Sequence, residues 1–411
     1  MKMTPLAVAV ALAAAGAAQA QSSVTLYGIA DAGISHIRGL NSAKTQLVSG
    51  IMEGSRFGFR GNEDLGGGYR TIFTLENRLE LDTGALGNRP ASGSQLPARF
   101  SSATALGLPA PLQPAVTQVA AGIGAQLGVN HIANNLFDRQ AWVGLVTPVG
   151  AVLMGRQYTP AYEVSATFDT LYTASSLAFG QIAAIPPSVD IRVSNSVAYR
   201  IQTGPWSAAA MYGLGEGSAT TGRLIGINAI YKVDAFSLGI AYQERDNENG
   251  QKSLTNFIVG GSAALGPGKL SIEYVRAKDD NPSGLTPVIA QLTPAIGPVF
   301  AASVVNAFRA ALRQDANAFH IGYRYETGPH AVSVVYNRFD DRNDLDADVQ
   351  SYGAVYSYAF SKRTDVSVVL AKFNNSETAQ AAGGGQGYLG GVTSSPGRDF
   401  ENVAVGIRHR F

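Results

Sequence analysis

The side chains with most potential for chemistry are charged groups that share one face of short extended segments. In residues 69–80, the polar residues of one parity oppose large apolar residues of the other: Arg70, Thr74, Glu76 and Arg78 against Tyr69, Phe73 and Leu75. Side chains alternate between the two faces of a strand, so the guanidinium and carboxylate groups would lie together. Such a face can pair with ions or orient polar solutes, because ionised groups make the strongest hydrogen bonds.

Catalytic and metal signatures are missing from the sequence. The five histidines, at positions 36, 131, 320, 330 and 409, have no metal-ligand spacing. No nucleophile elbow or phosphate loop occurs, and the glycines at 66–68 indicate a turn. The chain has no cysteine, which excludes thiol chemistry and cysteine-based metal sites. The sequence therefore predicts no enzyme, metal or cofactor, with a Ser/His pair assembled in space as the remaining enzymatic alternative.

The N-terminus has the features of a secretory signal peptide. Lys2 precedes an uncharged run over residues 6–18, and Ala18 and Ala20 are small residues that predict cleavage between Ala20 and Gln21. A membrane anchor is the alternative, but this run is shorter than the ~20 residues that a spanning helix needs. We therefore expect a signal peptide at 1–20 and one domain at 21–411.

The composition excludes several classes of protein. Removal of Lys2 with the signal leaves 31 − 1 = 30 basic residues against 30 acidic ones. A neutral chain argues against nucleic acid as a partner. The sequence has 47 Gly, 17 Tyr and 17 Phe but only 15% charged residues, and long amphipathic helices are missing. Short alternating segments take their place.

These alternating segments predict sixteen strands. In residues 319–326 the odd positions are large and apolar, and the same period of two recurs in 349–360 and 402–411. The expected strands are 24–35, 51–62, 69–80, 136–147, 150–158, 192–202, 206–214, 222–232, 236–245, 253–265, 269–278, 316–326, 331–340, 348–360, 364–374 and 399–411.

The connections between these strands are of two kinds. Every second one is a tight turn that contains Gly, Pro or other turn residues: 63–68, 147–150, 204–205, 233–234, 266–268, 327–329 and 361–363. The others are variable and often long: 36–50, 81–135, 159–191, 215–221, 246–252, 279–315, 341–347 and 375–398. Short periplasmic turns that alternate with long external loops are typical of an outer-membrane barrel.

The face chemistry supports the same architecture. Polar faces carry Gly, Ser, Arg and Glu, whereas apolar faces are rich in Tyr and Phe, which suits lipid outside and water inside. A soluble sandwich also alternates, but it must fill a compact core. We therefore predict an all-β fold, a sixteen-stranded antiparallel transmembrane β-barrel. The uncharged stretches 100–130 and 284–308 contain several prolines, so we interpret them as Ala/Pro-rich loops, the second ending in a short helix near 304–312.

Six motifs in order resemble the general porins of Gram-negative bacteria, in particular the β-proteobacterial branch. They are Val24-Thr25-Leu26-Tyr27-Gly28, Gly54-Ser55-Arg56-Phe57-Gly58-Phe59-Arg60-Gly61 followed by residues 63–68, Phe137-Asp138-Arg139-Gln140-Ala141-Trp142-Val143-Gly144-Leu145, Gly155-Arg156-Gln157-Tyr158, Arg192-Val193-Ser194-Asn195-Ser196-Val197 and Arg408-His409-Arg410-Phe411. Together they extend over nearly the whole chain after residue 20.

The resemblance implies a homotrimer in the bacterial outer membrane whose third external loop folds into the lumen. It places Arg56 and Arg139 on the pore wall and Asp169 at an acidic position of the loop, with Tyr158 and Tyr162 near its base. It also implies that the terminal residue, Phe411, is part of a signal for the barrel-insertion machinery. Ile29 and Thr173 depart from the enterobacterial pattern, which has a pore lysine and a second loop acid there.

The pore residues expected at the constriction are Arg56, Arg70, Arg78, Arg139, Arg156, Tyr158, Tyr162, Glu163 and Asp169. Opposed guanidinium and carboxylate groups would set up a transverse field through which small hydrophilic solutes and ions diffuse. Wall salt bridges or contacts with lipid headgroups are the alternative for each arginine. Because few loop acids are present, we expect a weak anion preference.

Parity leaves one conflict at the wall position Arg139. It groups Arg139 with Ala141 and Val143, so an inward Arg139 would turn Gln140 and Trp142 toward lipid.

Other residues have two interpretations. The aromatic residues at 352, 356, 358 and 360 could guide sugars inside the lumen, but their parity favours a lipid-facing girdle. The acidic run 340–348 could bind divalent cations that bridge lipopolysaccharide, although a solvated loop fits its spacing better. A substrate-specific channel and an adhesin or receptor that uses the long loops remain rival functions.

Overall fold

The computed structural model describes residues 22–41, 43–86, 96–126, 135–183, 187–216, 222–384 and 391–411. The expected signal peptide and its cleavage site at Ala20 and Gln21 lie outside these residues.

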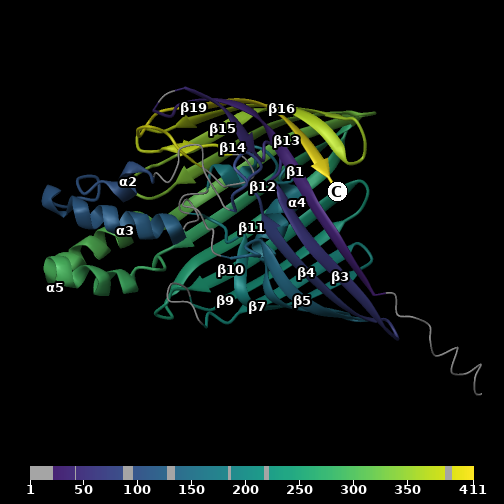
Figure 1. The fold of residues 1–411 in the computed structure, drawn as a ribbon, viewed down its shortest axis with the longest axis horizontal. Helices are drawn as coiled ribbons and strands as arrows, with labels where there is room; N and C mark the ends of the chain where they lie inside the picture. Colours follow the sequence, from purple (N-terminus) through teal and green to yellow (C-terminus); the bar gives the residue numbers. More distant parts are fainter. Residues whose placement is uncertain are drawn as a thin grey trace, which may run out of the picture.

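One antiparallel sheet forms the body of the molecule (Figure 1). Within the described residues it has 17 strands, of which β2 and β3 are successive parts of one barrel strand, so sixteen strands surround the lumen. They are β1 (Ser23–Arg38), β2 (Lys44–Ser49), β3 (Arg56–Gly66), β4 (Tyr69–Arg78), β5 (Gln140–Thr147), β6 (Gly150–Tyr158), β7 (Arg192–Thr203), β8 (Trp206–Gly213), β9 (Leu224–Lys232), β10 (Phe236–Asp246), β11 (Lys252–Leu265), β12 (Gly268–Asp279), β13 (Gln314–Thr327), β14 (His330–Asp341), β15 (Val349–Ala359), β16 (Thr364–Asn375) and β19 (Phe400–Arg410).

Pairing of the first and last strands closes the barrel. Ten residues of β1, from Ile29 to Arg38, pair with β19. The terminal Phe411 extends this seam, because its amide and carbonyl exchange 3.1 Å hydrogen bonds with Gly28. A Cβ on Gly28 would collide with the Phe411 ring, so only glycine lets the C-terminal side chain pack there. The barrel thus has no free edge.

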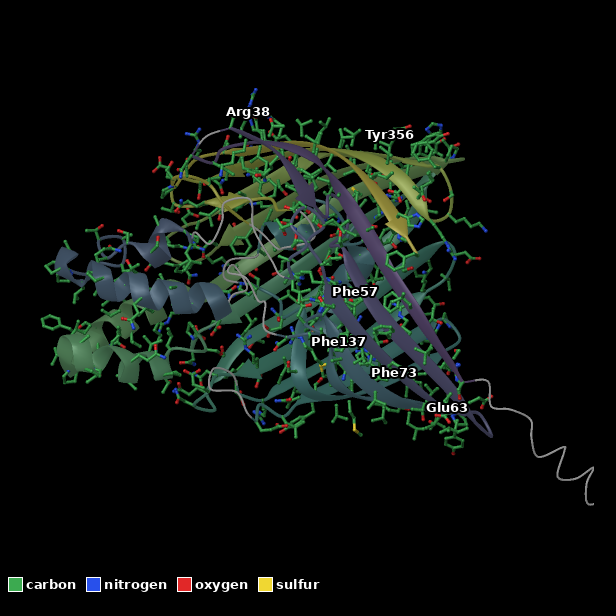
Figure 2. All side chains as sticks on the ribbon, viewed as in Figure 1. Arg38, Phe57, Glu63, Phe73, Phe137 and Tyr356 are labelled. Carbon is green, nitrogen blue, oxygen red and sulfur yellow. The ribbon has the colours of Figure 1, made fainter. Side chains whose placement is uncertain are left out.

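The predicted alternation is present in the strands. In β10 buried and exposed residues alternate over the first eight positions, with Leu238, Ile240 and Tyr242 on the exposed, outward face. The lipid-facing interpretation of the C-terminal aromatics is confirmed. On β15, Tyr352 and Tyr356 are each 40% exposed, while Ser351 on the opposite face of the same strand is buried. Figure 2 shows Tyr356 on the outside of the wall.

The two ends of the barrel differ as the loop lengths predict. Glu63 marks the end with tight turns, and the long loops gather at the opposite end (Figure 2). The first external loop is shorter than expected, because β1 continues to Arg38 and β2 resumes at Lys44. The second barrel strand, which consists of β2 and β3, is interrupted at residues 50–55, where the chain folds into the lumen.

The interpretation of the uncharged stretches as irregular loops is wrong, except that the short helix expected near 304–312 is present as the end of a longer helix. Residues 96–126 contain α2 (Ala98–Ser101), η1 (Ala110–Leu112) and α3 (Gln113–Gln126), and residues 286–312 form α5 (Thr286–Leu312) with a kink at Gly297. Figure 1 shows α2, α3 and α5 as a helical dome beyond the external rim. By length and composition α5 could cross a membrane, but both of its ends return to the rim.

Mutual packing explains why these segments are helical. An apolar core joins the helices of the dome and includes Phe100, Val116, Ile123, Val304 and Phe308. Two prolines of α5 occupy tolerated places: Pro287 is in the first turn, and Pro298 follows the kink at Gly297. The sequence shows the prolines but not the tertiary partner that stabilises each helix.

Candidate pore constriction

The third external loop, residues 159–191, is here called L3, and its described part, 159–183 and 187–191, folds into the lumen. It begins with α4 (Pro160–Phe168), whose first turn is capped by the Thr159 hydroxyl accepting from the amide of Tyr162 at 3.2 Å. At its other end the Phe168 ring packs on the inner wall over Gly239 and Gly260. A Cβ at either glycine would overlap that ring, so two glycines on adjacent strands form the seat for L3.

Beyond α4 the chain turns sharply around Asp169. Its carboxylate accepts from the amides of Leu171, Thr173 and Phe179 at 2.9, 3.2 and 3.0 Å. Asp169 is only 1% exposed. Its charge therefore organises the loop from within and does not project into the water of the lumen.

The wall then holds L3 along its length. His320 of β13 contacts the Thr170 amide at 3.0 Å, and Asn337 of β14 donates to the Leu177 carbonyl at 3.0 Å. Asn402 of β19 donates to the Ser176 hydroxyl at 3.1 Å. L3 thus crosses from the β9–β12 side of the barrel to the closing seam.

A second inward element comes from the interruption between β2 and β3. Asp31 of β1 is fully buried, and its carboxylate accepts from the amides of Ile51, Met52 and Glu53 at 2.8, 3.0 and 2.7 Å. This carboxylate replaces the inter-strand backbone hydrogen bonds that the chain loses where it leaves the sheet. The inward segment, residues 50–55, meets the tip of L3, because the amide of Ser175 donates to the carbonyl of Met52 at 2.8 Å.

Arg139 and Glu76 form the most buried ion pair on the wall that faces L3. Their Nε and Oε1 atoms are 2.7 Å apart, and the side chains are 7% and 3% exposed. The Tyr158 hydroxyl accepts from Arg139 at 3.2 Å and from Arg192 at 3.0 Å. The Arg192 guanidinium also lies 4.6 Å from the centre of the Tyr158 ring.

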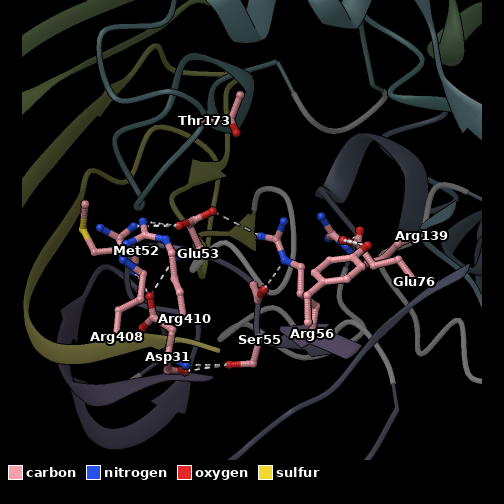
Figure 3. A network of polar contacts seen from close by, with 12 residues as sticks. Asp31, Met52, Glu53, Ser55, Arg56, Glu76, Arg139, Thr173, Arg408 and Arg410 are labelled. Carbon is pink, nitrogen blue, oxygen red and sulfur yellow. Dashed lines mark hydrogen bonds and ion pairs between the residues drawn. The ribbon is translucent and has the colours of Figure 1, made fainter. Parts of the chain in front are cut away.

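A second charged group continues from this pair toward the closing seam (Figure 3). Arg56 lies between the Arg139–Glu76 pair and Glu53, to which it is linked at 3.5 Å. The carboxylate of Glu53 accepts from both Arg408 and Arg410 at 2.8 Å. Both arginines also reach Asp365, at 2.9 and 3.3 Å. We call these two groups, with L3 opposite, the throat: Glu53, Arg56, Glu76, Arg139, Tyr158, Tyr162, Arg192, Asp365, Arg408 and Arg410.

The structure resolves the parity conflict at Arg139. Gln140 and Trp142 are cross-strand partners of Glu76 and Thr74, so they share the lumen face of β4. The alternative that turned them toward lipid is therefore wrong. Arg139 precedes β5, and its amide donates to the Glu76 carbonyl at 3.2 Å, which lets its side chain turn inward before strict alternation begins.

The other expected constriction residues lie in different surroundings. Arg78 pairs with Asp138 at 3.4 Å and is buried, and Arg156 donates to the Asp138 carbonyl at 2.7 Å. Glu163 of α4 is joined to Arg200 and accepts from Asn228 at 3.0 Å. Arg70 is exposed and pairs with Asp64 in register beside the β3–β4 turn, far along the strand from the throat.

Tyr162 is the L3 residue that completes the throat. Its ring stacks on Tyr158 with centroids 5.1 Å apart, and its hydroxyl donates to Thr173 at 3.4 Å. Sequence reasoning missed five charged throat residues: Glu53, Arg192, Asp365, Arg408 and Arg410. Arg192, Arg408 and Arg410 stand in two of the quoted motifs, whereas Glu53 and Asp365 stand in none. Strand parity at the C-terminus gave no register with β1.

Comparison with known proteins agrees with this architecture. The sequence model of a family described as Gram-negative porin matches residues 7–378. An outer membrane porin protein of Bordetella pertussis is 26% identical over 100% of both chains, and outer membrane porin protein 32 of Delftia acidovorans is 26% identical over 95% of each.

Solved structures show the same fold. The anion-selective porin from Comamonas acidovorans has a TM-score of 0.66 at 22% identity, covering 95% of this chain and 100% of that one. OmpT of Vibrio cholerae in its trimer form has a TM-score of 0.59 at 13% identity, covering 95% of this chain and 99% of that one.

A closed sixteen-stranded barrel with an inward L3 and charged groups on its inner wall defines a diffusion channel of the bacterial outer membrane. The chain belongs to the Gram-negative porin family.

Proposed function

We propose that the throat passes small hydrophilic solutes and ions by passive diffusion with a weak preference for anions. The supporting observation is the charge balance around the throat. Five arginines face three carboxylates there: Arg56, Arg139, Arg192, Arg408 and Arg410 against Glu53, Glu76 and Asp365. The formal balance of this set is 5 − 3 = +2.

The arrangement of these charges explains how selection would operate. The guanidinium groups lie on the wall, while the L3 acid Asp169 is buried among loop amides. The other two L3 acids, Glu163 and Asp190, are each paired with an arginine of the wall, so anions meet a wall whose formal charge is positive. In a narrow throat between low-dielectric walls such a potential acts over the whole cross-section.

Reversal potential in a KCl gradient across a planar bilayer tests this proposal. We expect the reversal potential to have the sign that indicates chloride preference. Its magnitude should decrease as the salt concentration rises, because the Debye length falls to about 3 Å at 1 M. Conductance linear in salt would accompany a general channel, whereas saturation or block by one solute would indicate a substrate-specific channel. A clear cation preference would overturn the anion assignment.

We further propose that the chain is secreted with residues 1–20 as signal peptide and acts as a homotrimer in contact with lipid and lipopolysaccharide. The trimer form of the related OmpT supports the assembly. The packing of Phe411 on Gly28 supports a role for the last residue in barrel insertion and closure. None of the throat residues is assigned a catalytic role.

The helical dome supports a second candidate, an adhesin or receptor role at the cell surface. Val299 and Phe300 at the kink of α5 are 74% and 52% exposed. Replacing residues 286–312 by a short Gly/Ser linker separates the two roles. A porin keeps its conductance without this helix, whereas an adhesin loses surface binding.

A further inference from the structure

Tyr172, near the turn of L3, has an unusual backbone conformation. Its φ is 54°, and those of Thr173 and Ser175 are 64° and 70°. Such left-handed angles are uncommon for residues other than glycine and persist only where the surroundings enforce them. Here the carboxylate of Asp169 accepts from the Thr173 amide, and the carbonyl of Met52 accepts from the Ser175 amide. The result is an aromatic side chain that is 53% exposed.

Two cations from the inner wall flank this ring. The Lys269 amine is 5.6 Å and the Arg324 guanidinium 5.9 Å from its centre. Lys269 and Arg324 are cross-strand partners on β12 and β13. Lys269 is the second residue of β12 after the tight turn, so Tyr172 points toward the periplasmic end of the lumen.

The charge of this group is not balanced. Arg324 donates to Glu326 at 2.6 Å, and Glu326 is itself 63% exposed. Among the residues that the structure describes, no carboxylate oxygen lies within 4.0 Å of the Lys269 amine. One positive charge thus stands beside the Tyr172 ring without an acidic partner.

The contrast with Tyr158 shows which of the two tyrosines is open to a solute. Tyr158 is covered by Arg192 at 4.6 Å and by the Tyr162 ring at 5.1 Å. Tyr172 has the two cations near it but no second ring stacked on it among the described residues. A planar group can therefore lie on Tyr172 but not on Tyr158.

We propose that Tyr172, Lys269 and Arg324 form a subsite for aromatic carboxylates on the periplasmic side of the throat. This assignment rests on the proposed diffusion of anions through the channel. The carboxylate pairs with the Lys269 amine and the Arg324 guanidinium, while the ring stacks in an offset geometry on Tyr172. Stacked aromatic pairs contribute enough to favour a ring over a saturated group of similar size by about twofold to tenfold.

Single-channel recording with benzoate as the probe tests the subsite. Benzoate, cyclohexanecarboxylate and acetate are added in KCl to each side of the bilayer in turn. We expect benzoate to reduce the mean current saturably, at a concentration about twofold to tenfold below that of cyclohexanecarboxylate. Acetate should have the weakest effect.

Variants at Tyr172 and Lys269 separate the contribution of the tyrosine ring to benzoate binding from that of the positive charge. Tyr172→Asn, which tolerates a positive φ, should abolish the difference between benzoate and cyclohexanecarboxylate, and Tyr172→Phe should retain it. Lys269→Gln should weaken both carboxylates equally. Lys362→Gln removes a positive charge from a periplasmic turn and serves as the matched control.

The outcomes distinguish this subsite from the general proposal. Equal effects of the two ring compounds on the wild-type channel, or an unchanged preference in Tyr172→Asn, would overturn the subsite. The reversal potential in KCl alone reports the anion preference of the throat. A benzoate effect that depends on Tyr172 in a cation-preferring channel would support the subsite and reject the anion assignment.

Discussion

The amide of Ser175 donates a 2.8 Å hydrogen bond to the carbonyl of Met52, and this contact joins two inward-folded segments that are far apart in the sequence. The amide of Met52 donates in turn to the carboxylate of Asp31. The tip of L3 is thus supported by a buried side chain of the first strand. Asp31 contacts no solute pathway directly, and we regard it as a positioning residue.

Replacing Asp31 should loosen the throat. In Asp31→Asn one carboxylate oxygen becomes an NH2 group that cannot accept from the amides of the inward segment. Hydrogen bonds to charged groups contribute about 1.5–3 kcal/mol each, so we expect a loss on the order of 3 kcal/mol. The temperature of barrel unfolding in detergent should fall and open-channel noise should rise. Asp82→Asn, on an exposed loop, is the control; the same unfolding temperature and noise in both variants would contradict this role.

The seat of Phe168 gives a second prediction. A valine at Gly260 would overlap the Phe168 ring and push α4 toward the centre of the lumen. We expect Gly260→Val to lower single-channel conductance. Gly261→Val is the matched control, because the nearest atom to its Cβ is the flexible end of Leu238, at 3.2 Å, and its other neighbours lie at ordinary contact distances of 3.5 and 4.0 Å. If both variants conduct like the wild type, L3 is not seated in this way.

Arg192 should contribute directly to selectivity. Its guanidinium contacts the Tyr158 hydroxyl, and no ion pair joins it to a carboxylate in the described part of the chain. Arg192→Gln should therefore move the reversal potential toward zero, more at 0.1 M than at 1 M salt. Arg38→Gln, at the rim where the side chain is 68% exposed, should leave it unchanged. Equal shifts in the two variants would show that net charge alone, and not the throat, sets the preference.

The dome should have a pH-sensitive attachment. Glu248 accepts from the amides of Gly284 and Thr286, both at 2.8 Å, at the start of α5. Partial burial raises the pKa of Glu248, but these amides lower it more, and the net pKa is below its usual 4.5. A lowered folded pKa means that the stabilisation is complete above the unfolded value and is lost as pH falls through the folded one.

Hydrogen exchange of residues 284–292 should therefore be slow at neutral pH and should accelerate below about pH 4.5. Glu248→Gln should exchange fast at both pH values. The same pH response in the variant and the wild type would assign the effect to another group.

The core of the dome should be separable from the channel. Phe308 is fully buried between the helices, and Phe308→Ala should cost roughly 3–5 kcal/mol of local stability. We expect faster proteolysis within residues 286–312 and unchanged KCl conductance. A loss of conductance would mean that the dome also shapes the pathway.

The sequence predicts the barrel well because alternation and turn chemistry are local. All sixteen barrel strands appear in the predicted order, separated by tight turns as expected, although the second begins earlier, at Lys44, and is interrupted at 50–55. Of the helices of the dome, only the short segment near 304–312 was predicted, since each helix is stabilised by the others across about 170 residues of sequence. Their prolines indicated loops when each segment was considered alone.

The throat was predicted only in part, because some of its geometry depends on contacts between segments that are distant in the sequence. Arg56, Arg139 and Tyr158 stand in the quoted motifs, and the resemblance placed Tyr162 near the base of the loop; all four lie together in the structure. Asp169 stands at the expected position, yet its carboxylate is turned into the loop by three amides. Backbone hydrogen bonding of this kind depends on the path of L3, which no spacing of residues encodes.

The attachment of L3 to opposite parts of the wall has a mechanical consequence. A segment fixed at Gly260 on one side and at Asn402 on the other acts as an internal brace across the cylinder. Any force that flattens the cylinder from its round section must shift this brace relative to the arginine-lined wall. We therefore expect lateral pressure in the bilayer to change the width of the passage.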